Sequence, residues 1–188
     1  MFDAIQSIDF AILDFIVEHI RCGFLDAVMP AISSFADHGI GWIAIAVILL
    51  FFKKTRKAGA AMGVALIFGL IVGNATLKPL VGRIRPYDIN TTVPMLVERL
   101  SDFSFPSGHT LASFEGGVVL FIKHRKIGIA AMVLAVLIAF SRLYLYVHFP
   151  SDVIVGAILG TIFAVLGCVI VDKAWAAVET KLAAKKAA

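Results

Sequence analysis

The sequence predicts an all-α fold: a single domain, residues 1–188, built as a polytopic membrane bundle of about six transmembrane helices with an amphipathic interfacial helix at the N-terminus. Three observations predict it. Hydrophobic residues make up 60% of the chain and its mean hydropathy is +0.95, more apolar surface than one soluble core requires. The apolar residues form long runs separated by short polar turns. Basic residues gather at the ends of these runs, and 188 residues leave no room for a second domain.

The first element is residues 4–20, where apolar residues alternate with Asp9, Asp14 and Glu18 at near-helical spacing. This pattern is typical of a helix that lies along the membrane interface, because the segment is too polar to span. No basic n-region or small-residue cleavage site of a secretory signal is present, so we expect the first residues to be retained.

Six spans are expected, at 24–36, 40–52, 58–77, 109–122, 127–145 and 152–172. The first two are short and are separated only by the triplet Asp37-His38-Gly39, so we expect them to meet in a turn. The third is rich in glycine and alanine, which let helices approach closely. Four of the six prolines fall in the polar connection at 79–108. Long connections of this kind tend to carry function.

The positions of lysine and arginine predict the orientation of the bundle. Basic residues occupy two turns and the C-terminal tail: Lys53, Lys54, Arg56, Lys57, Lys123, Arg125, Lys126, Lys173, Lys181, Lys185 and Lys186. In a six-span bundle they all face one side, which the positive-inside tendency makes the cytoplasm. We therefore expect both termini in the cytoplasm and the connections at 79–108 and 145–151 on the extracytoplasmic face. Membrane orientation also accounts for the net charge of +4 without a nucleic-acid partner.

Two clusters on the extracytoplasmic face are candidates for binding an anion. In the first, the third span ends in Lys78, Arg83 and Arg85; a simpler reading makes these snorkelling anchors or, for Arg83, a headgroup contact. In the second, Ser107 is placed to cap the fourth span, with Gly108 and His109 in its first turn. Free N–H groups at a helix start bind anions, although capped helix starts also occur for purely structural reasons.

The third cluster runs from Ser141 to Asp152 and is the most informative. A charged residue such as Arg142 at the end of an apolar span costs free energy, which indicates a functional role. We expect Ser151 to cap the last span, so that Asp152 in its first turn reaches back to His148. A histidine held by a carboxylate has a fixed tautomer and one sharpened nitrogen that can act as base or nucleophile, the alternative being an ordinary packed histidine.

Together the clusters gather cations, two histidines and a carboxylate on one face, a set that suits a phosphoryl group. One guanidinium group can donate to two phosphate oxygens at once and neutralise their charge. Phosphoryl transfer also needs stabilisation of the developing charge, an in-line nucleophile and a proton donor. No carboxylate cluster resembles a metal site, so we expect no metal and no cofactor. Cys22 and Cys168 lack metal or redox spacing and are expected to be free.

The three clusters contain motifs that resemble those of a known family: Lys78-x6-Arg85-Pro86, Pro106-Ser107-Gly108-His109 and Ser141-Arg142-x5-His148-x3-Asp152. They look like the signature motifs of the type 2 phosphatidic acid phosphatase family, and they define a motif-bearing core at 78–152. The resemblance implies that Lys78, Arg85, Ser107, Gly108 and Arg142 bind the substrate phosphate. It implies that His148 attacks phosphorus, that Asp152 orients His148, and that His109 protonates the leaving group and then activates water.

The resemblance further implies a lipid phosphate or diphosphate phosphohydrolase that works through a phosphohistidine. Short bacterial members look like undecaprenyl-diphosphatases, so undecaprenyl diphosphate is the expected substrate and cell-wall carrier recycling the expected role; phosphatidylglycerophosphate or phosphatidate is the alternative. Two other classes are alternatives. A vanadate-dependent oxidase would use the same anion pocket, but the compact, nearly all-membrane chain favours a lipid substrate. A transporter would spread its ionisable residues toward the midplane and across both faces, whereas here they lie at one face. The expected partners are the lipid substrate and membrane lipids, with no nucleic acid, and the oligomeric state is left open.

Two remaining expectations concern residues outside the motifs. Glu115 lies within the fourth span, where a carboxylate must face the bundle or water, as a helix–helix hydrogen bond or as a partner of the site. Four aromatic residues near span ends are expected to be interfacial anchors: Trp42, Tyr87, Tyr144 and Tyr146. The alternative for Tyr144 and Tyr146 is that they line the lipid entrance.

Overall fold

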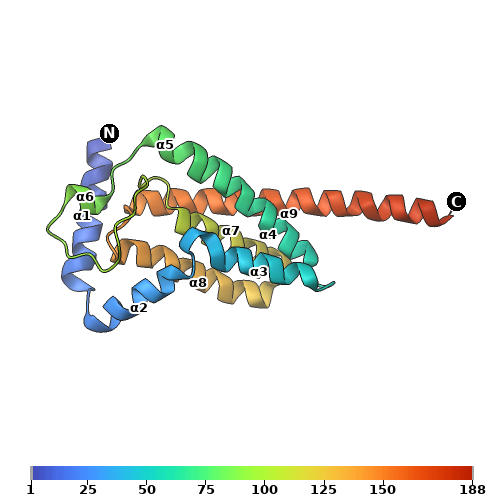
Figure 1. The fold of residues 1–188 in the computed structure, drawn as a ribbon, viewed down its shortest axis with the longest axis horizontal. Coiled ribbons are helices and arrows are strands. Elements are labelled where there is room, and N and C mark those ends of the chain that lie inside the picture. The colour runs from blue at the N-terminus through green and yellow to red at the C-terminus, as the bar shows by residue number, and fades with distance from the viewer. Residues whose placement is uncertain (1, 188) are drawn as a thin grey trace.

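The computed structural model describes residues 2–187, with side chains for residues 4–185, and this part of the chain is helical with no strand. Figure 1 shows an elongated bundle in which most helices run along one axis, with the long connection between α6 and α7 at one end. The elements are α1 (Phe2–His19), α2 (Gly23–Ser34), η1 (Asp37–Gly39), α3 (Ile40–Phe51), α4 (Arg56–Phe68), η2 (Gly69–Leu77), α5 (Lys78–Val81), α6 (Pro86–Ile89), α7 (Gly108–Lys123), α8 (Arg125–Tyr144) and α9 (Pro150–Ala187).

Helix α7 is the centre of the bundle, packed against α8 and α9, while α4 packs against α9 and α3. Glycines make these contacts close. A side chain at Gly160 of α9 would meet the backbone oxygen of Leu111 at 2.5 Å, and one at Gly59 of α4 would meet that of Ala46 at 2.6 Å. Small residues at such crossings let apolar helices associate by van der Waals contact where lipid gives no hydrophobic driving force between them.

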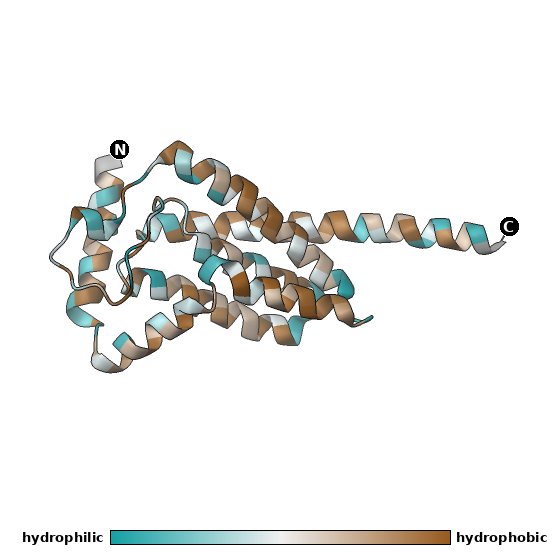
Figure 2. Cartoon of the chain, viewed as in Figure 1, coloured by the Kyte–Doolittle hydropathy of each residue, from teal (hydrophilic) through white to brown (hydrophobic). Residues whose placement is uncertain are grey.

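Four segments of the described chain are long and apolar enough to cross a membrane: Gly23–Phe51, Arg56–Ile89, Arg125–Tyr144 and Pro150–Lys185. The 16-residue α7 runs among them along the same axis (Figure 1). In Figure 2 the middle of the bundle is predominantly hydrophobic, whereas polar residues concentrate in the loops at one end and toward the tip of α9. The chain is therefore a multi-pass membrane protein.

The expectation that residues 24–36 and 40–52 are two separate spans is wrong, although a turn does lie between them. Helices α2 and α3 continue in the same general direction on either side of η1 and form one broken crossing, 29 residues in length (Figure 1). The break is a single tight turn in which His38 and Gly39 have positive φ of 52° and 72°, so the chain is offset and not reversed. The predicted count of six spans is accordingly not what the structure contains, because two expected spans are one.

Helix α1 lies across the loop-bearing end of the bundle, roughly perpendicular to its axis, and contacts α8 and α9 (Figure 1). Leu13 and Ile16 are buried, while Ile8 and Phe15 on the opposite face are 62% and 55% exposed. The two termini lie at opposite ends of the molecule. The expectation that both termini share one side is therefore wrong, because the broken crossing removes one reversal of the chain.

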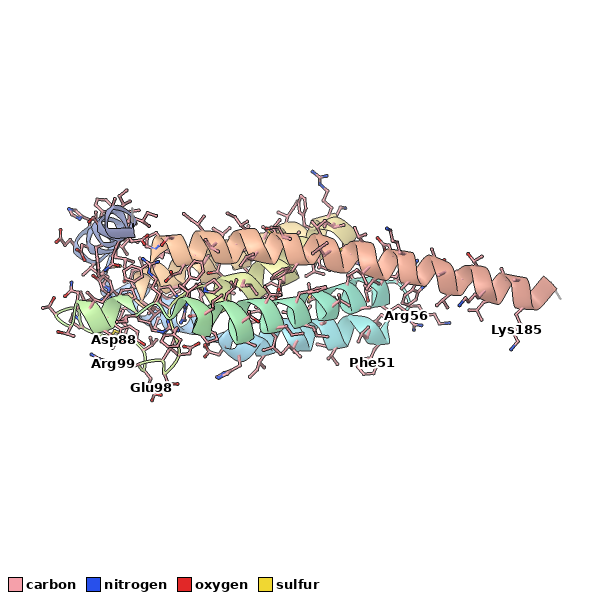
Figure 3. The ribbon with its side chains drawn as sticks, turned by 90° about the horizontal axis from the view of Figure 1, so that it is seen from above. Phe51, Arg56, Asp88, Glu98, Arg99 and Lys185 are labelled. Carbon is pink, nitrogen blue, oxygen red and sulfur yellow. The ribbon has the colours of Figure 1, made fainter. Side chains whose placement is uncertain are left out.

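Three of the remaining expected spans agree with the structure within a few residues, as α4 with η2, α7 and α8, whereas the last, expected to end at 172, is part of α9, which continues to Ala187. Helix α9 extends well past its neighbours, and Lys185 lies near its far tip (Figure 3). Ion pairs join α9 to the two basic turns, between Lys57 and Glu179 at 3.6 Å and between Lys123 and Asp172 at 2.5 Å. These turns thus lie at the end opposite to the long 79–108 connection.

Candidate active site

The three sequence motifs meet at the end of the bundle that α1 covers. His148 lies in the turn between α8 and α9 and is 1% exposed. Its Nδ1 atom lies 3.6 Å from Oδ2 of Asp152 and 3.5 Å from Oγ of Ser104, while its Nε2 atom lies 3.3 Å from Nη1 of Arg85. The structure therefore brings together His148, Asp152 and Arg85, as the motifs predicted.

Asp152 is fully buried and is held from several sides. Its Oδ2 atom accepts hydrogen bonds from the hydroxyl of Ser104 at 2.5 Å and from the backbone N–H of Phe149 at 3.0 Å. Since α9 begins at Pro150, the Phe149 contact makes Asp152 the residue that caps the helix. The expectation that Ser151 is the cap is wrong: its N–H and hydroxyl both donate to Asp9 of α1, at 2.9 and 2.5 Å.

Lys78 and Arg85 share a carboxylate that the motifs do not contain. Asp102 accepts from Lys78 through one oxygen and from Nη2 of Arg85 through the other at 2.6 Å. Arg85 is 2% exposed and also donates to the carbonyl of Val147 at 2.7 Å. Burial raises the pKa of Asp102, but hydrogen bonding to and the charge of Lys78, together with Arg85, outweigh it and lower the pKa to about 2. Asp102 thus forms ion pairs with Lys78 and Arg85, two of the cations that are expected to bind phosphate.

The start of α7 forms the second half of the site. Ser107 caps the helix as expected, its hydroxyl accepting from the Thr110 N–H, and its own N–H donates to the Asp152 carbonyl at 3.2 Å. A side chain at Gly108 would meet Asn74 of η2 at 3.0 Å. Nε2 of His109 lies 2.7 Å from Oδ1 of Asp37, which belongs to η1. The break between α2 and α3 therefore delivers a carboxylate to His109.

Arg142 is 3% exposed and donates from Nη1 to the hydroxyl of Ser33 at the end of α2. Burial lowers the pKa of His148 well below 6.5, and the positive charges of Arg85, Arg142 and Lys78 act in the same direction. His148 is therefore uncharged near neutral pH. Because the guanidinium of Arg85 can only donate, the Nε2 atom facing it is the nitrogen with a free lone pair and the proton resides on Nδ1.

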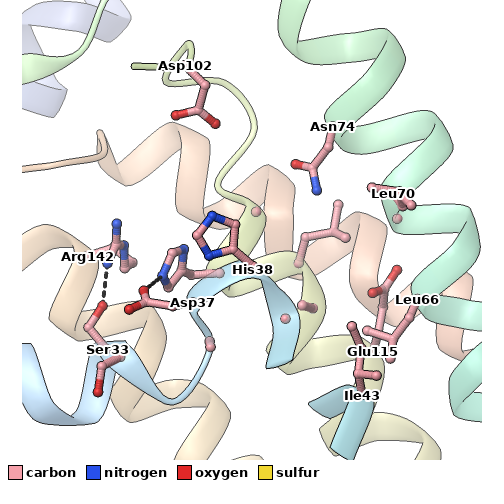
Figure 4. A pocket seen from close by; sticks show the side chains of 18 of the residues that line it. Ser33, Asp37, His38, Ile43, Leu66, Leu70, Asn74, Asp102, Glu115 and Arg142 are labelled. Atoms are coloured by element: carbon pink, nitrogen blue, oxygen red, sulfur yellow. Dashed lines mark hydrogen bonds and ion pairs between the residues drawn. The ribbon is translucent and has the colours of Figure 1, made fainter. Parts of the chain in front are cut away.

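A cavity of about 1120 Å³ opens from this cluster. At one end it is lined by seven site residues: Lys78, Arg85, Asp102, Gly108, His109, Arg142 and His148. It continues between α3 and α4 along apolar residues, and Figure 4 shows Ile43, Leu66 and Leu70 at this end and Asp102 and Arg142 at the other. Glu115 lies with the apolar group, against Gly69, and not among the cations. Ser107 and Asp152 are fully buried and do not line the cavity.

Comparison with known proteins agrees with this geometry. The family model of the PAP2 superfamily matches residues 58–176, which contain all three motifs. The chain belongs to the PAP2 superfamily. Among its relatives, the undecaprenyl-diphosphatase of Sulfolobus acidocaldarius is 31% identical over 158 residues, covering 83% of this chain and 76% of the relative. Phosphatidylglycerophosphatase B of Bacillus subtilis is 36% identical over 173 residues, covering 84% and 80%.

A crystal structure of a transmembrane PAP2-type phosphatidylglycerolphosphate phosphatase from Bacillus subtilis matches this fold with a TM-score of 0.73. The two are 32% identical, and the match covers 90% of this chain and 87% of the other. The PAP2 fold thus extends over nearly the whole chain, beyond the matched family region.

Five site residues were not predicted from the sequence: Asp9, Ser33, Asp37, Asp102 and Ser104. The first three come from helices far from the motifs along the chain, and the last two lie in the 79–108 connection just before Ser107. Arg83 is not a headgroup contact, since it donates to Asp9 and Asp152 at 2.7 and 2.6 Å. The four expected interfacial aromatics are instead buried, each with its polar atom bonded inside the protein: Trp42, Tyr87, Tyr144 and Tyr146.

Proposed function

We propose that this PAP2 protein hydrolyses undecaprenyl diphosphate to undecaprenyl phosphate through a covalent phosphohistidine on His148, without a metal. At the level of class, the chain is a membrane lipid phosphatase. The observation that carries the proposal is the continuous cavity, which joins a cluster of cations and histidines to an apolar groove between α3 and α4. A ligand that fits both ends has a phosphate head and a hydrocarbon tail.

The groove suits a tail too long for any closed pocket. Its lining residues Ile43, Val47 and Ile67 are also 45–57% exposed on the outside of the bundle, so the groove opens sideways toward the membrane. A prenyl chain can lie there and continue into the bilayer while its head reaches the cations. Acyl chains meet the same requirement, and the similarity to phosphatidylglycerophosphatase B favours phosphatidylglycerophosphate as the second candidate.

In the first step Nε2 of His148 attacks the terminal phosphorus, forming an N–P bond as the bond to the leaving oxygen breaks. Lys78, Arg85 and Arg142 neutralise the phosphoryl oxygens, together with the Gly108 N–H at the start of the helix that Ser107 caps. Asp152 stabilises the positive charge that develops on the His148 ring. His109 gives its proton to the leaving oxygen and then takes one from the water that cleaves the N–P bond, and Asp37 orients its ring.

Turnover by the purified enzyme in mixed micelles tests this function. His148→Ala should lower phosphate release by about 10⁴-fold or more while the protein stays folded, because the attacking atom is deleted. Activity should survive excess EDTA, since side chains supply the positive charge. Appreciable turnover by the alanine variant would refute the nucleophile. A kcat/KM for phosphatidylglycerophosphate about tenfold above that for the prenyl diphosphate, some 1.4 kcal/mol in transition-state binding, would refute the substrate.

The orientation is also a proposal. The basic turns after α3 and α7 and the basic stretch of α9 lie at one end, so the positive-inside tendency assigns that end to the cytoplasm and the site to the extracytoplasmic face. Helix α1 then lies on the same extracytoplasmic face as the site, with its apolar side facing the membrane boundary.

A further inference from the structure

The guanidinium of Arg83 links α1 to the start of α9, next to the turn at residues 145–149 that carries His148. This turn is called the catalytic turn below. Its Nη1 atom donates to Oδ1 of Asp152 at 2.6 Å and to the hydroxyl of Ser151 at 2.7 Å, and its Nη2 atom donates to Oδ2 of Asp9 at 2.7 Å. Its Cζ atom lies 3.9 Å from the centre of the Phe149 ring. Both terminal nitrogens and one face of the side chain are thus committed to protein groups, which leaves Arg83 unsuited to binding substrate.

Asp9 completes the arrangement from α1. It is 3% exposed and accepts three hydrogen bonds, from Arg83 and from the N–H and hydroxyl of Ser151. A second carboxylate of the same helix, Asp14, accepts from the hydroxyl of Tyr146 at 2.8 Å. Tyr146 has a positive φ of 61°, an unfavourable conformation for a bulky residue. Helix α1 therefore holds the turn that carries His148 on both flanks.

The charges explain why this contact matters. Asp9 and Asp152 are two buried carboxylates on either side of Ser151, and Arg83 is the cation between them. Leaving buried carboxylates without a cation is costly, so removal of Arg83 would drive the carboxylates apart or neutralise one of them. The other cations near His148, namely Arg85, Lys78 and Arg142, face the cavity and cannot take its place.

We propose that Arg83 and Asp9 are positioning residues for catalysis: they fix the carboxylate of Asp152, and through it the ring of His148, in the orientation for attack. This inference rests on the proposed function. Arg83 acts directly on Asp152, and Asp9 acts by holding Arg83 and Ser151. Helix α1 is on this account a working part of the active site and not only a membrane anchor.

The test compares Arg83→Gln, Arg83→Lys, Asp9→Asn and the Arg83→Gln/Asp9→Asn double variant of the full chain with wild type in detergent. Arg83→Gln should lower kcat roughly 100-fold, the size expected when a reacting group is misplaced by about an ångström. Both KM and inhibition by inorganic phosphate should stay within about twofold, because the phosphate-binding cations are untouched. Asp9→Asn should lower kcat about tenfold, and the double variant should lose less than the product of the single losses.

Three comparisons keep the outcome decisive. Asp172→Asn, which removes an exposed ion pair at the opposite end, is the matched control and should behave as wild type. If Arg83→Gln does not fold, Arg83→Lys is the test, because lysine retains the positive charge but not the two terminal nitrogens of the guanidinium. It should still lower kcat while KM changes little. Wild-type kcat in folded Arg83→Gln or Arg83→Lys, with an inactive His148→Ala, overturns the positioning role alone; an active His148→Ala overturns the proposed function itself.

Discussion

The Nε2 atom of His109 lies 2.7 Å from the Oδ1 atom of Asp37, a residue 72 positions earlier in the chain. This contact depends on the break between α2 and α3, which places Asp37 beside the start of α7. It gives His109 the same kind of carboxylate support that Asp152 gives His148. The two histidines of the site are therefore each held by a carboxylate from a different part of the fold.

From this contact we predict that Asp37→Asn lowers kcat by about 10- to 100-fold, because His109 loses the partner that orients its ring for proton transfer. The phosphohistidine should accumulate, since its hydrolysis needs His109 to activate water. Rapid mixing with a ³²P-labelled substrate followed by an alkaline quench measures the trapped phosphoenzyme. Asp88→Asn, at an exposed ion pair on the same end, is the control. Unchanged turnover in Asp37→Asn would refute the support role.

Asp102 should act as an internal substitute for phosphate. Asp102→Asn leaves Lys78 and Arg85 without their carboxylate, so its Tm should fall by about 2–4 °C, the shift that roughly 1 kcal/mol produces in a domain of this size. Added phosphate should raise the Tm more in the variant than in wild type, because the cations are vacant. Scanning fluorimetry in detergent measures both. A variant that phosphate stabilises no more than wild type would contradict competition for the cations.

The same carboxylate predicts a pH dependence. The pKa of Asp102 in the folded protein is about 2, below the value of about 3.9 for an unfolded chain. Its contribution to stability is therefore complete above about pH 4 and is lost as the pH falls toward 2. The Tm difference between wild type and Asp102→Asn should be constant above pH 5 and shrink on acidification. A difference that grows on acidification would show the opposite sign.

His148 sets a second pH expectation, for activity. Burial and the neighbouring cations hold its pKa well below 6.5, so the proposed nucleophile is already uncharged at pH 6.5. The acid limb of kcat/KM due to the enzyme should therefore lie below pH 6.5. Profiles with a lipid monophosphate and a lipid diphosphate separate this limb from substrate ionisation, because only the enzyme limb is common to both. A common limb at or above pH 6.5 would disagree with the buried environment.

The lateral groove can be filled without disturbing the bundle. Gly63 lines it, and a Cβ added there would meet no heavy atom within 4 Å, so Gly63→Phe should fold. We expect KM for undecaprenyl diphosphate to rise about tenfold, while a short water-soluble phosphate ester is hydrolysed as before. Gly23→Phe, at a position with equal free space at the start of α2, controls for the substitution itself. Equal losses on both substrates would place the tail elsewhere.

Topology gives the last prediction. In a background lacking Cys22 and Cys168, cysteines at Ala11 and Thr92 should react with an impermeant thiol reagent on intact cells, whereas one at His124 should react only after permeabilisation. The reason is that α1 and the long connection lie at one end of the bundle and the 123–126 turn at the other. External labelling at His124 would invert the orientation, and protection of Ala11 alone would separate α1 from the site.

The motifs predicted the local part of the site. Ser107, His148 and Asp152 could be placed from sequence because their geometry follows from helix starts and short spacings. Asp9 and Asp37 could not, because their partners are distant in the chain and a polar residue beside an apolar run is equally compatible with a turn or a lipid headgroup contact. Asp102 could not, because only the path of the long connection brings it back to Lys78 and Arg85. The direction of α3 could not be predicted for the same reason. The triplet Asp37-His38-Gly39 is compatible with a chain that reverses its direction or with one that is only offset, and tertiary contacts decide between the two.

The single broken crossing made by α2 and α3 has a consequence for biogenesis. Under the proposed orientation, α1 must itself be carried across the membrane when α2 and α3 insert. Residues 1–20 contain four acidic residues and no lysine or arginine. Such a segment has no lysine or arginine to favour its retention in the cytoplasm. The carboxylates that clamp the catalytic turn are thus compatible with the export of α1, whereas basic residues at the same positions would oppose it.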